Sequence, residues 1–328
     1  MLKRLSVAVA ILAAPASAAA PSYSVVGQYR GGDGGWDAAS VDPAHHRLYI
    51  ARSDRIMAVD LASGQVTDRL APAERGHSAL AIPGTSEVIS TNGTANNALI
   101  FDGATGKVRA TIATGKKPDA VVYDPATRSL WVMNAGDGSV TIVDPVTEKV
   151  VGTMPVGGSL EFGAADGKGR LYVNVEDKNE VAVIDTRKRT VVAHEPLAGC
   201  DGPTGMAYVA SARETVSACA NGVADVLTTG GKLVASVPIG PRPDGAAYDA
   251  RRNIVLIPSG AEGTLYAISM TGTPKVVAKV ATAKSARTIA LDPSTGRAYL
   301  PAADLLPAVG SERPQPKPGT FRVIVVAP

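Results

Sequence analysis

Short apolar runs separated by Gly, Pro and Asp turns recur along most of the chain. Residues 140–144 (VTIVD) and 181–185 (VAVID) alternate in polarity and end in Asp, and shorter apolar runs at 130–132 (LWV) and 171–173 (LYV) precede them. Runs rich in Val, Ile and Tyr between turn residues are typical of β-strands. No stripe with a helical period appears, so the pattern predicts an all-β protein.

A dipeptide that follows the first strand of each unit measures the repeat. It occurs seven times, at spacings of about 40–43 residues, and four apolar segments accompany each copy. This is the period of a β-propeller blade, and propellers contain about 4–8 blades. The copies are Asp42-Pro43, Ile82-Pro83, Asp124-Pro125, Asp166-Gly167, Val209-Ala210, Asp249-Ala250 and Asp292-Pro293. We therefore predict a seven-bladed β-propeller of four-stranded blades.

The two ends of the chain predict how this ring closes. Residues 24–29 (SVVGQY) resemble a fourth strand but precede the first blade, whereas the seventh blade has no fourth strand after residues 321–326. The N-terminal strand is expected to complete the last blade, which removes an open sheet edge. A single propeller domain over residues 19–328 follows from this closure.

The N-terminus has the features of a secretory signal peptide. Lys3 and Arg4 precede an apolar run at residues 5–14, and Ala16-Ser17-Ala18 forms a small-residue cleavage pattern. We expect residues 1–18 to be removed, with cleavage as late as residue 20, and the mature protein to be periplasmic or secreted. No later segment approaches the roughly 20 apolar residues that a membrane-spanning helix needs, so none is predicted.

The charge of the mature chain limits the partners it can hold by bulk attraction. Loss of Lys3 and Arg4 lowers the formal net charge from +3 to +1. A nearly neutral protein has no overall field that would hold phosphates or anionic lipid. This balance argues against nucleic acid as a partner.

The repeated motifs resemble those of a known family. Residues 117–134 (KPDAVVYDPATRSLWVMN) and 242–257 (RPDGAAYDARRNIVLI) match each other closely, and residues 140–145 read VTIVDP. These units resemble the YVTN-type β-propeller repeats of exported bacterial proteins, including YncE-like periplasmic proteins. The resemblance covers essentially the whole mature chain and implies the fold. It implies no single activity, because such propellers bind varied partners.

Both cysteines fall in the fifth blade. Cys200 precedes the first strand of that blade and Cys219 ends the second. Antiparallel strands bring these positions to the same end of the blade, and disulfides persist in exported proteins. We predict a structural disulfide between Cys200 and Cys219.

A ring of mixed polar residues is the candidate site. Five residues before each repeat dipeptide, the innermost strand begins beside the central channel, and the second strand returns to the same face. We expect the following side chains to meet at one channel mouth: Asp37, Arg52, His77, Asn92, Asp119, Asn134, Glu161, Asp244 and Arg287. The alternative is that the Asp side chains cap their own turns, as Asp often does.

Two function classes follow from this ring. The first is a monomeric, non-enzymatic binding or scaffold propeller that recognises a small ligand or protein partner at the channel face. The second is a lactonase-like hydrolase that uses channel carboxylates. No cofactor is assigned, but a divalent cation is compatible with oxygen ligands from Asp37, Asp119, Glu161, Asn92 and Asn134. No compact catalytic motif such as G-x-S-x-G or H-E-x-x-H is present.

Single-stranded DNA binding is a third class, which only the resemblance to YncE-like proteins implies. It requires aromatic stacking platforms next to cations. Trp36 is expected at the mouth beside Arg52, whereas Trp131 lies within a strand and is expected in the core.

Two further segments have alternative readings. The pair His45-His46 could suggest a metal site, but we expect it in an exposed turn on the face opposite the mouth. Residues 303–319 contain four prolines and should form an insertion on the same face as the ring. That insertion is either a tolerated surface loop or a flap or docking arm over the channel.

Overall fold

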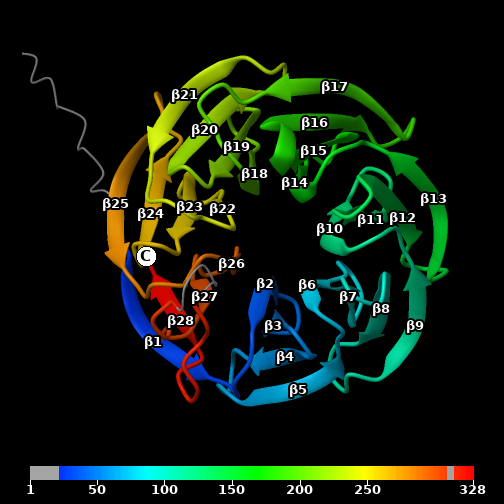
Figure 1. Cartoon of the computed structure of the whole chain (residues 1–328), viewed down its shortest axis with the longest axis vertical. Coiled ribbons are helices and arrows are strands. Elements are labelled where there is room, and N and C mark those ends of the chain that lie inside the picture. Colours follow the sequence, from blue (N-terminus) through cyan, green and yellow to red (C-terminus); the bar gives the residue numbers. More distant parts are fainter. Residues whose placement is uncertain (1–21, 309–313) are drawn as a thin grey trace, which may run out of the picture.

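Seven four-stranded antiparallel sheets surround a central axis (Figure 1), which confirms the predicted propeller. The computed structural model describes residues 22–308 and 314–328, so the leader predicted at residues 1–18 lies outside the described residues. Within the described residues, no helix is long and apolar enough to cross a membrane.

Each blade is built outward from the axis. The innermost strands are β2 (Trp36–Asp42), β6 (Gly76–Ala81), β10 (Pro118–Asp124), β14 (Leu160–Ala165), β18 (Pro203–Val209), β22 (Ala247–Asp249) and β26 (Ala290–Leu291). The second strands are β3 (Arg47–Arg52), β7 (Glu87–Asn92), β11 (Ser129–Asn134), β15 (Arg170–Val175), β19 (Glu214–Cys219), β23 (Ile254–Ser259) and β27 (Ala298–Ala302). A short 3-10 helix, η1 (Glu176–Lys178), follows β15.

The outer half of each blade completes the sheet. The third strands are β4 (Arg55–Asp60), β8 (Asn97–Asp102), β12 (Ser139–Asp144), β16 (Glu180–Asp185), β20 (Val223–Thr228), β24 (Thr264–Ser269) and β28 (Arg322–Ala327). The outermost strands are β5 (Val66–Pro72), β9 (Val108–Ala113), β13 (Lys149–Pro155), β17 (Thr190–Pro196), β21 (Leu233–Pro238), β25 (Lys275–Ala281) and β1 (Ser24–Arg30).

The N-terminal strand closes the ring as predicted. β1 pairs antiparallel with β28, from Ser24 opposite Ala327 to Arg30 opposite Arg322, and forms the outer strand of the seventh blade. These main-chain hydrogen bonds fix the segment that leads into the first blade to the last blade.

Burial explains why the inner strands read as continuous apolar runs. Every residue of β11 is buried, including Trp131, which is fully buried as expected, because neighbouring blades cover both faces. Trp131 packs with Leu160 and Leu171 of the next blade. The outer strand β17 instead alternates between exposed and partly buried residues, since one of its faces meets water.

Asp residues at strand ends stabilise the hairpin turns. Asp102 Oδ1 accepts hydrogen bonds from the amides of Ala104 (3.1 Å) and Thr105 (2.8 Å) and from the Thr105 hydroxyl (2.8 Å). These bonds hold the pKa of Asp102 below its ordinary value. Asp60 caps the equivalent turn of the first blade in the same way.

Cys200 and Cys219 form the predicted disulfide, and their Cα atoms are 5.3 Å apart.

His45 lies in the exposed turn between β2 and β3, where its Nδ1 contacts Asp42 Oδ2 at 2.8 Å. Its partner is a turn-capping carboxylate, in line with the expectation that this His pair is a surface feature.

The insertion between β27 and β28 emerges at the end of the molecule where β2 begins. The Gly319 amide donates to Asp33 Oδ1 at 2.6 Å, and Leu305 forms a β-bridge with Pro316. Asp33 directly precedes the first blade, so the described part of the insertion lies on the face expected for the ring. Residues 309–313 are outside the described range.

Candidate functional site

Strand register places the ring positions at equivalent points in successive blades. Trp36 pairs with Arg52, Gly76 with Asn92, Pro118 with Asn134, Leu160 with Val175 and Pro203 with Cys219. One residue after the first member of each pair come Asp37, His77, Asp119, Glu161 and Thr204. The innermost strands line the centre of the ring (Figure 1), so these five residues occupy equivalent backbone positions beside the channel.

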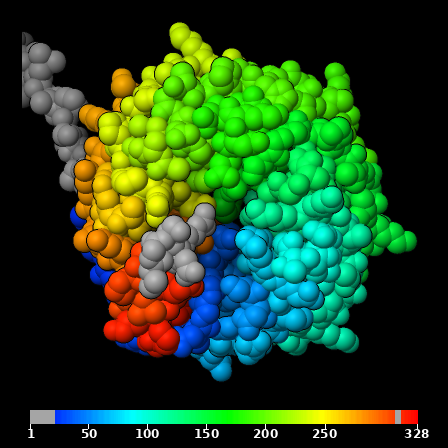
Figure 2. Space-filling model, viewed as in Figure 1, coloured from blue at the N-terminus to red at the C-terminus, as the bar shows by residue number. Residues whose placement is uncertain are grey.

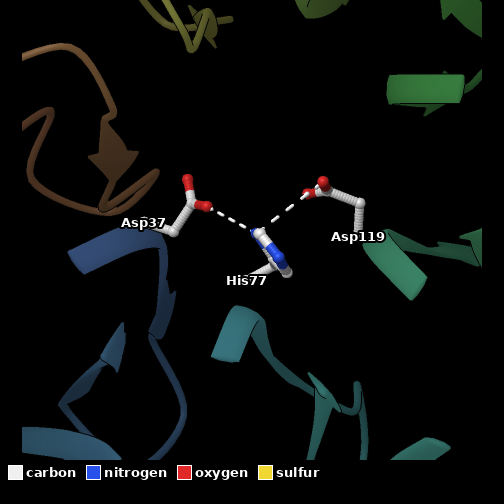
Figure 3. A group of neighbouring side chains, drawn as sticks. All are labelled: Asp37, His77 and Asp119. Carbon is white, nitrogen blue, oxygen red and sulfur yellow. Dashed lines mark hydrogen bonds and ion pairs between the residues drawn. The ribbon is translucent and has the colours of Figure 1, made fainter. Parts of the chain in front are cut away.

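His77 lies between two carboxylates from neighbouring blades. Its Nδ1 is 2.8 Å from Asp37 Oδ2 and 3.7 Å from Asp119 Oδ2. Figure 3 shows both carboxylates directed toward the His77 ring, Asp37 from β2 and Asp119 from β10. The imidazole therefore links blades one, two and three.

Arg287 continues this arrangement on the other side of Asp37. Its Nε donates to Asp244 Oδ2 at 2.6 Å, its Nη2 lies 3.9 Å from Asp37 Oδ1, and it also donates to the Trp36 carbonyl at 3.1 Å. Acid and base thus alternate over five successive positions. We call Asp244, Arg287, Asp37, His77 and Asp119 the charged ring.

The carboxylates of the charged ring do not cap their own turns. Those of Asp37 and Asp244 pair with side chains of neighbouring blades, unlike Asp60 and Asp102 in the hairpins. Hydroxyl donors instead hold the backbone here, as where Thr288 donates to the Asp37 carbonyl at 2.9 Å. The cross-blade pairing distinguishes the ring from the turn-capping alternative.

Glu161 follows Asp119 around the channel but has no basic partner in the alternating arrangement. It is partly buried, and among the described residues no side chain forms an ion pair or hydrogen bond with it. Burial, reinforced by the charges of Asp119 and Asp244, raises the pKa of Glu161 to about 10. A cation from a bound ligand would therefore stabilise the ionised form of this carboxyl group.

Two acids of the charged ring, Asp119 and Asp244, also have raised pKa values. Burial raises the pKa of Asp119 to about 7, with the Asp37 charge adding to the effect, and raises that of Asp244 to about 6 against the opposing pull of Arg287. Burial alone would lower the pKa of His77, but the hydrogen bond that His77 donates to Asp37 and the charge of Asp119 raise it above its ordinary value. At neutral pH Asp119 is therefore partly protonated, and a cation bound beside it would favour its ionised form.

Arg52 lies away from the channel. Its guanidinium is fully buried, donates to the carbonyls of Gly32, Gly34 and Gly35, and lies 3.5 Å from the centre of the Phe321 ring. Burial lowers its pKa to about 10, so it remains a cation at neutral pH. This residue joins the loop before β2 to the last blade and is not brought into the charged ring.

The two candidate Asn residues are likewise occupied within their blades. Asn92 accepts the Glu74 amide at 3.0 Å and donates to Asn97 at 2.9 Å. Asn134 donates to Ser139 and Thr141. Both side chains are buried, and neither contacts the charged ring.

A cavity of about 690 Å³ opens above part of the ring. Asp244 and Arg287 contribute to its wall, together with Trp36 from the first blade and Leu305 and Pro316 from the insertion. In Figure 2 the blades meet at a hollow near the centre of this face. The hollow gives a ligand access to the level of the charged ring.

Three lining residues carry charge that the sequence pattern did not reveal. Glu176 follows β15, Arg242 precedes Asp244 by two residues, and Lys284 precedes Arg287 by three. A count from the repeat dipeptides could have found Arg242 and Lys284, because both lie in the loops that lead to ring residues, whereas Glu176 lies between the second and third strands of its blade.

Asp37, His77 and Asp119 could also hold a divalent metal ion. One ligand atom of each lies within 4.8 Å of those of the others, and His with carboxylates suits transition metals. The other His77 nitrogen, Nε2, is buried without a hydrogen-bond partner among the described residues and faces Gly93. A metal-bound His usually donates its second nitrogen to a partner, so this orphan atom weighs against a resident ion.

The Glu161 environment predicts a pH-dependent gain in stability on neutralisation. Because its folded pKa is raised to about 10, the native state keeps a proton that the unfolded chain loses, and stability falls as pH rises from about 5 toward 10. Glu161→Gln should raise Tm by about 2–5 °C at pH 9 and change it little at pH 5. Glu148→Gln, which alters an acid paired with Arg109 at the outer surface, is the control. An equal Tm for wild type and Glu161→Gln at both pH values would contradict this environment.

Comparisons with known proteins identify the fold but no family. No family model and no curated protein matches the chain. Among solved structures, Kuenenia stuttgartiensis hydrazine synthase is similar, with a TM-score of 0.71 and 16% identity over 81% of this chain and 92% of that chain. A chain of a mitotic checkpoint complex is similar with a TM-score of 0.73 and 12% identity, over 100% of this chain and 98% of that one. At these identities the similarity is one of propeller fold.

Proposed function

We propose that this chain is an exported, non-enzymatic binding propeller that receives a positively charged group of a small ligand or protein partner at the channel mouth. The observation that carries the proposal is Glu161, an acid beside the charged ring with no partner of its own. Natural folds seldom keep such an acid without compensation, and a bound cation supplies it.

Proton release gives the proposed binding a distinctive signature. An ammonium or guanidinium near Glu161 and Asp119 favours their ionised forms, whose raised pKa values are about 10 and 7. Binding should therefore release protons and strengthen as pH rises from about 6 to 8.

The proposed setting is the periplasm or the extracellular space, and the proposed lineage is the YVTN-type, YncE-like propellers. The leader-like residues 1–18 and the repeat motifs support this placement. The disulfide between Cys200 and Cys219 fits an oxidising compartment. We propose a monomer, since the closed ring leaves no blade incomplete.

The hydrolase alternative rests on the Asp37, His77 and Asp119 cluster. A general base must reach the proton it removes. His77 Nδ1 already contacts Asp37, and Nε2 is buried against Gly93, so neither nitrogen faces a substrate directly. The cluster therefore favours a metal-binding role over a His-based acid–base role as the second candidate.

Nucleic-acid binding gains no support from the mouth aromatic. Trp36 is only 7% exposed and packs against Phe321, with ring centres 5.6 Å apart. It lines the mouth cavity and pairs with Arg52 across the strands, but so little of its ring is exposed that it offers a poor stacking platform for a base.

Isothermal titration calorimetry tests the proposal with a pair of matched peptides. Glycyl-leucyl-glycine amide carries one ammonium group, and its N-acetyl derivative carries none. At pH 8 we expect only the first to bind, with proton release measured in buffers of different ionisation enthalpy. Glu161→Gln should weaken binding at least about tenfold, equivalent to about 1.4 kcal/mol.

Glu214→Gln is the matched control, because burial also raises the pKa of Glu214 but this residue begins β19 at the end of the blade away from the mouth. Equal binding of the two peptides, or unchanged affinity in Glu161→Gln, would refute the proposal. A rise in Tm with Mn²⁺ or Zn²⁺ that is lost in Asp37→Asn/Asp119→Asn would favour the metal-binding alternative.

A further inference from the structure

Two cationic side chains in the mouth cavity have no partner of opposite charge. Arg242 and Lys284 both line it, and among the described residues neither side chain forms an ion pair or a hydrogen bond. Arg287, in contrast, is paired with Asp244 and lies near Asp37. The cavity lining therefore contains two unpaired cations together with the acids Asp244 and Glu176.

The chain fixes these two cations at successive entries to the ring. Arg242 lies two residues before Asp244, and its amide donates to the Ala220 carbonyl while its own carbonyl accepts the Gly260 amide, both at 3.1 Å. Lys284 precedes Ser285, whose hydroxyl donates to the Ala303 carbonyl. Both side chains are exposed at the rim, whereas Asp244 and Arg287 are partly buried beneath them.

One wall of the cavity is apolar. Leu305, Pro314 and Pro316 of the insertion line the same cavity as Arg242 and Lys284. Leu305 is 39% exposed, an unusual environment for a large aliphatic side chain next to a polar cavity. A low-dielectric wall strengthens the interaction of nearby charges with a ligand. The volume of about 690 Å³ suits a small organic molecule or a few residues of a peptide.

These features complement a ligand that carries both signs of charge. We infer that the cavity binds a zwitterionic, peptide-like ligand, with its ammonium group toward Glu161 and the charged ring and its carboxylate toward Arg242 and Lys284. An aliphatic side chain between them would contact Leu305 and Pro316. This inference rests on the proposed function and adds the anionic half of the ligand to it.

The test compares glycyl-leucyl-glycine, which has a free carboxylate, with the amide used above. In the wild type we expect the zwitterion to bind at least about tenfold more tightly than the amide, a difference of about 1.4 kcal/mol. In Arg242→Gln/Lys284→Gln the zwitterion should lose this advantage, while the amide should bind as well as before or better, since two repelling cations are gone.

Arg128→Gln is the matched control for the Arg substitution. Arg128 and Arg242 share a left-handed backbone, with φ of 53° and 56°, and both are exposed, but Arg128 lies in the turn between β10 and β11 at the opposite end of its blade. Its replacement should leave both affinities unchanged.

The outcomes separate this inference from the proposed function. The wild type could bind the zwitterion and the amide equally, with both affinities lost in Glu161→Gln. That result would refute recognition of the carboxylate but support the cation site. An advantage of the zwitterion that survives Arg242→Gln/Lys284→Gln would also overturn it. Absence of binding by either peptide would refute both proposals.

Discussion

Deletion of residues 19–30 should convert the protein from a folded ring into an aggregating chain. The deletion removes β1, whose pairing with β28 runs from Ser24 opposite Ala327 to Arg30 opposite Arg322. The edge of β28 would then expose unpaired amides and carbonyls, which template association with other chains. Tyr23, which packs in the core with Ile254, would be lost as well.

Size-exclusion chromatography with light scattering and thermal unfolding measures this result. A synthetic peptide of residues 22–30, added during refolding, should restore the monomer by supplying the missing strand. A truncated protein that stays monomeric with the Tm of the full chain would refute closure through β1.

The sequence predicted the fold well because one physical pattern repeats along the chain. Each blade must cover both faces of its inner strands and turn sharply between strands, so apolar runs and Asp turns recur at a fixed interval. The same regularity predicted closure by residues 24–29 and the disulfide, both of which are confirmed. Blades six and seven have shorter inner strands, three residues in β22 and two in β26.

The site was less predictable, and Arg52 shows why. Trp36 and Arg52 are paired across β2 and β3, so their side chains share one face of the blade, where both meet Phe321. Side chains alternate along a strand, so Asp37 points to the other side. The expectation that the ends of both strands aim into one mouth neglected this alternation. It misjudged Asn92 and Asn134 for the same reason.

Contacts between side chains of different blades were also not predicted from the sequence. Arg287 and Asp244 lie one blade apart, and Arg287 reaches Asp37 only because the ring closes. No local pattern encodes such a pair, since its geometry depends on the curvature of seven packed sheets. Counting from the repeat found the positions of the ring residues but gave no information on which charges pair and which, like Glu161, stay unpaired.

Loss of the disulfide should destabilise the fold substantially, although less than deletion of β1. In the chain-entropy model a bridge between residues 19 apart, as for Cys200 and Cys219, contributes about 3 kcal/mol by restricting the unfolded chain. Cys219→Ser should therefore lower the free energy of unfolding by about 2–5 kcal/mol. The start of β18 should loosen most, because Cys219 pairs with Pro203 there.

Urea denaturation with and without dithiothreitol checks this expectation, and a thiol titration of the unreduced, denatured protein checks the bond itself. The double variant Cys200→Ser/Cys219→Ser should match Cys219→Ser and reduced wild type in stability, because all three lack the same constraint.

The loosened strand carries Thr204, whose hydroxyl donates to the Pro243 carbonyl at 3.0 Å. This bond fixes the entry to blade six, because Pro243 directly precedes Asp244. Affinity for glycyl-leucyl-glycine amide should consequently fall on reduction. Two titratable thiols in protein purified from an oxidising compartment, or a denaturation midpoint that dithiothreitol leaves unchanged, would contradict this role of the bridge.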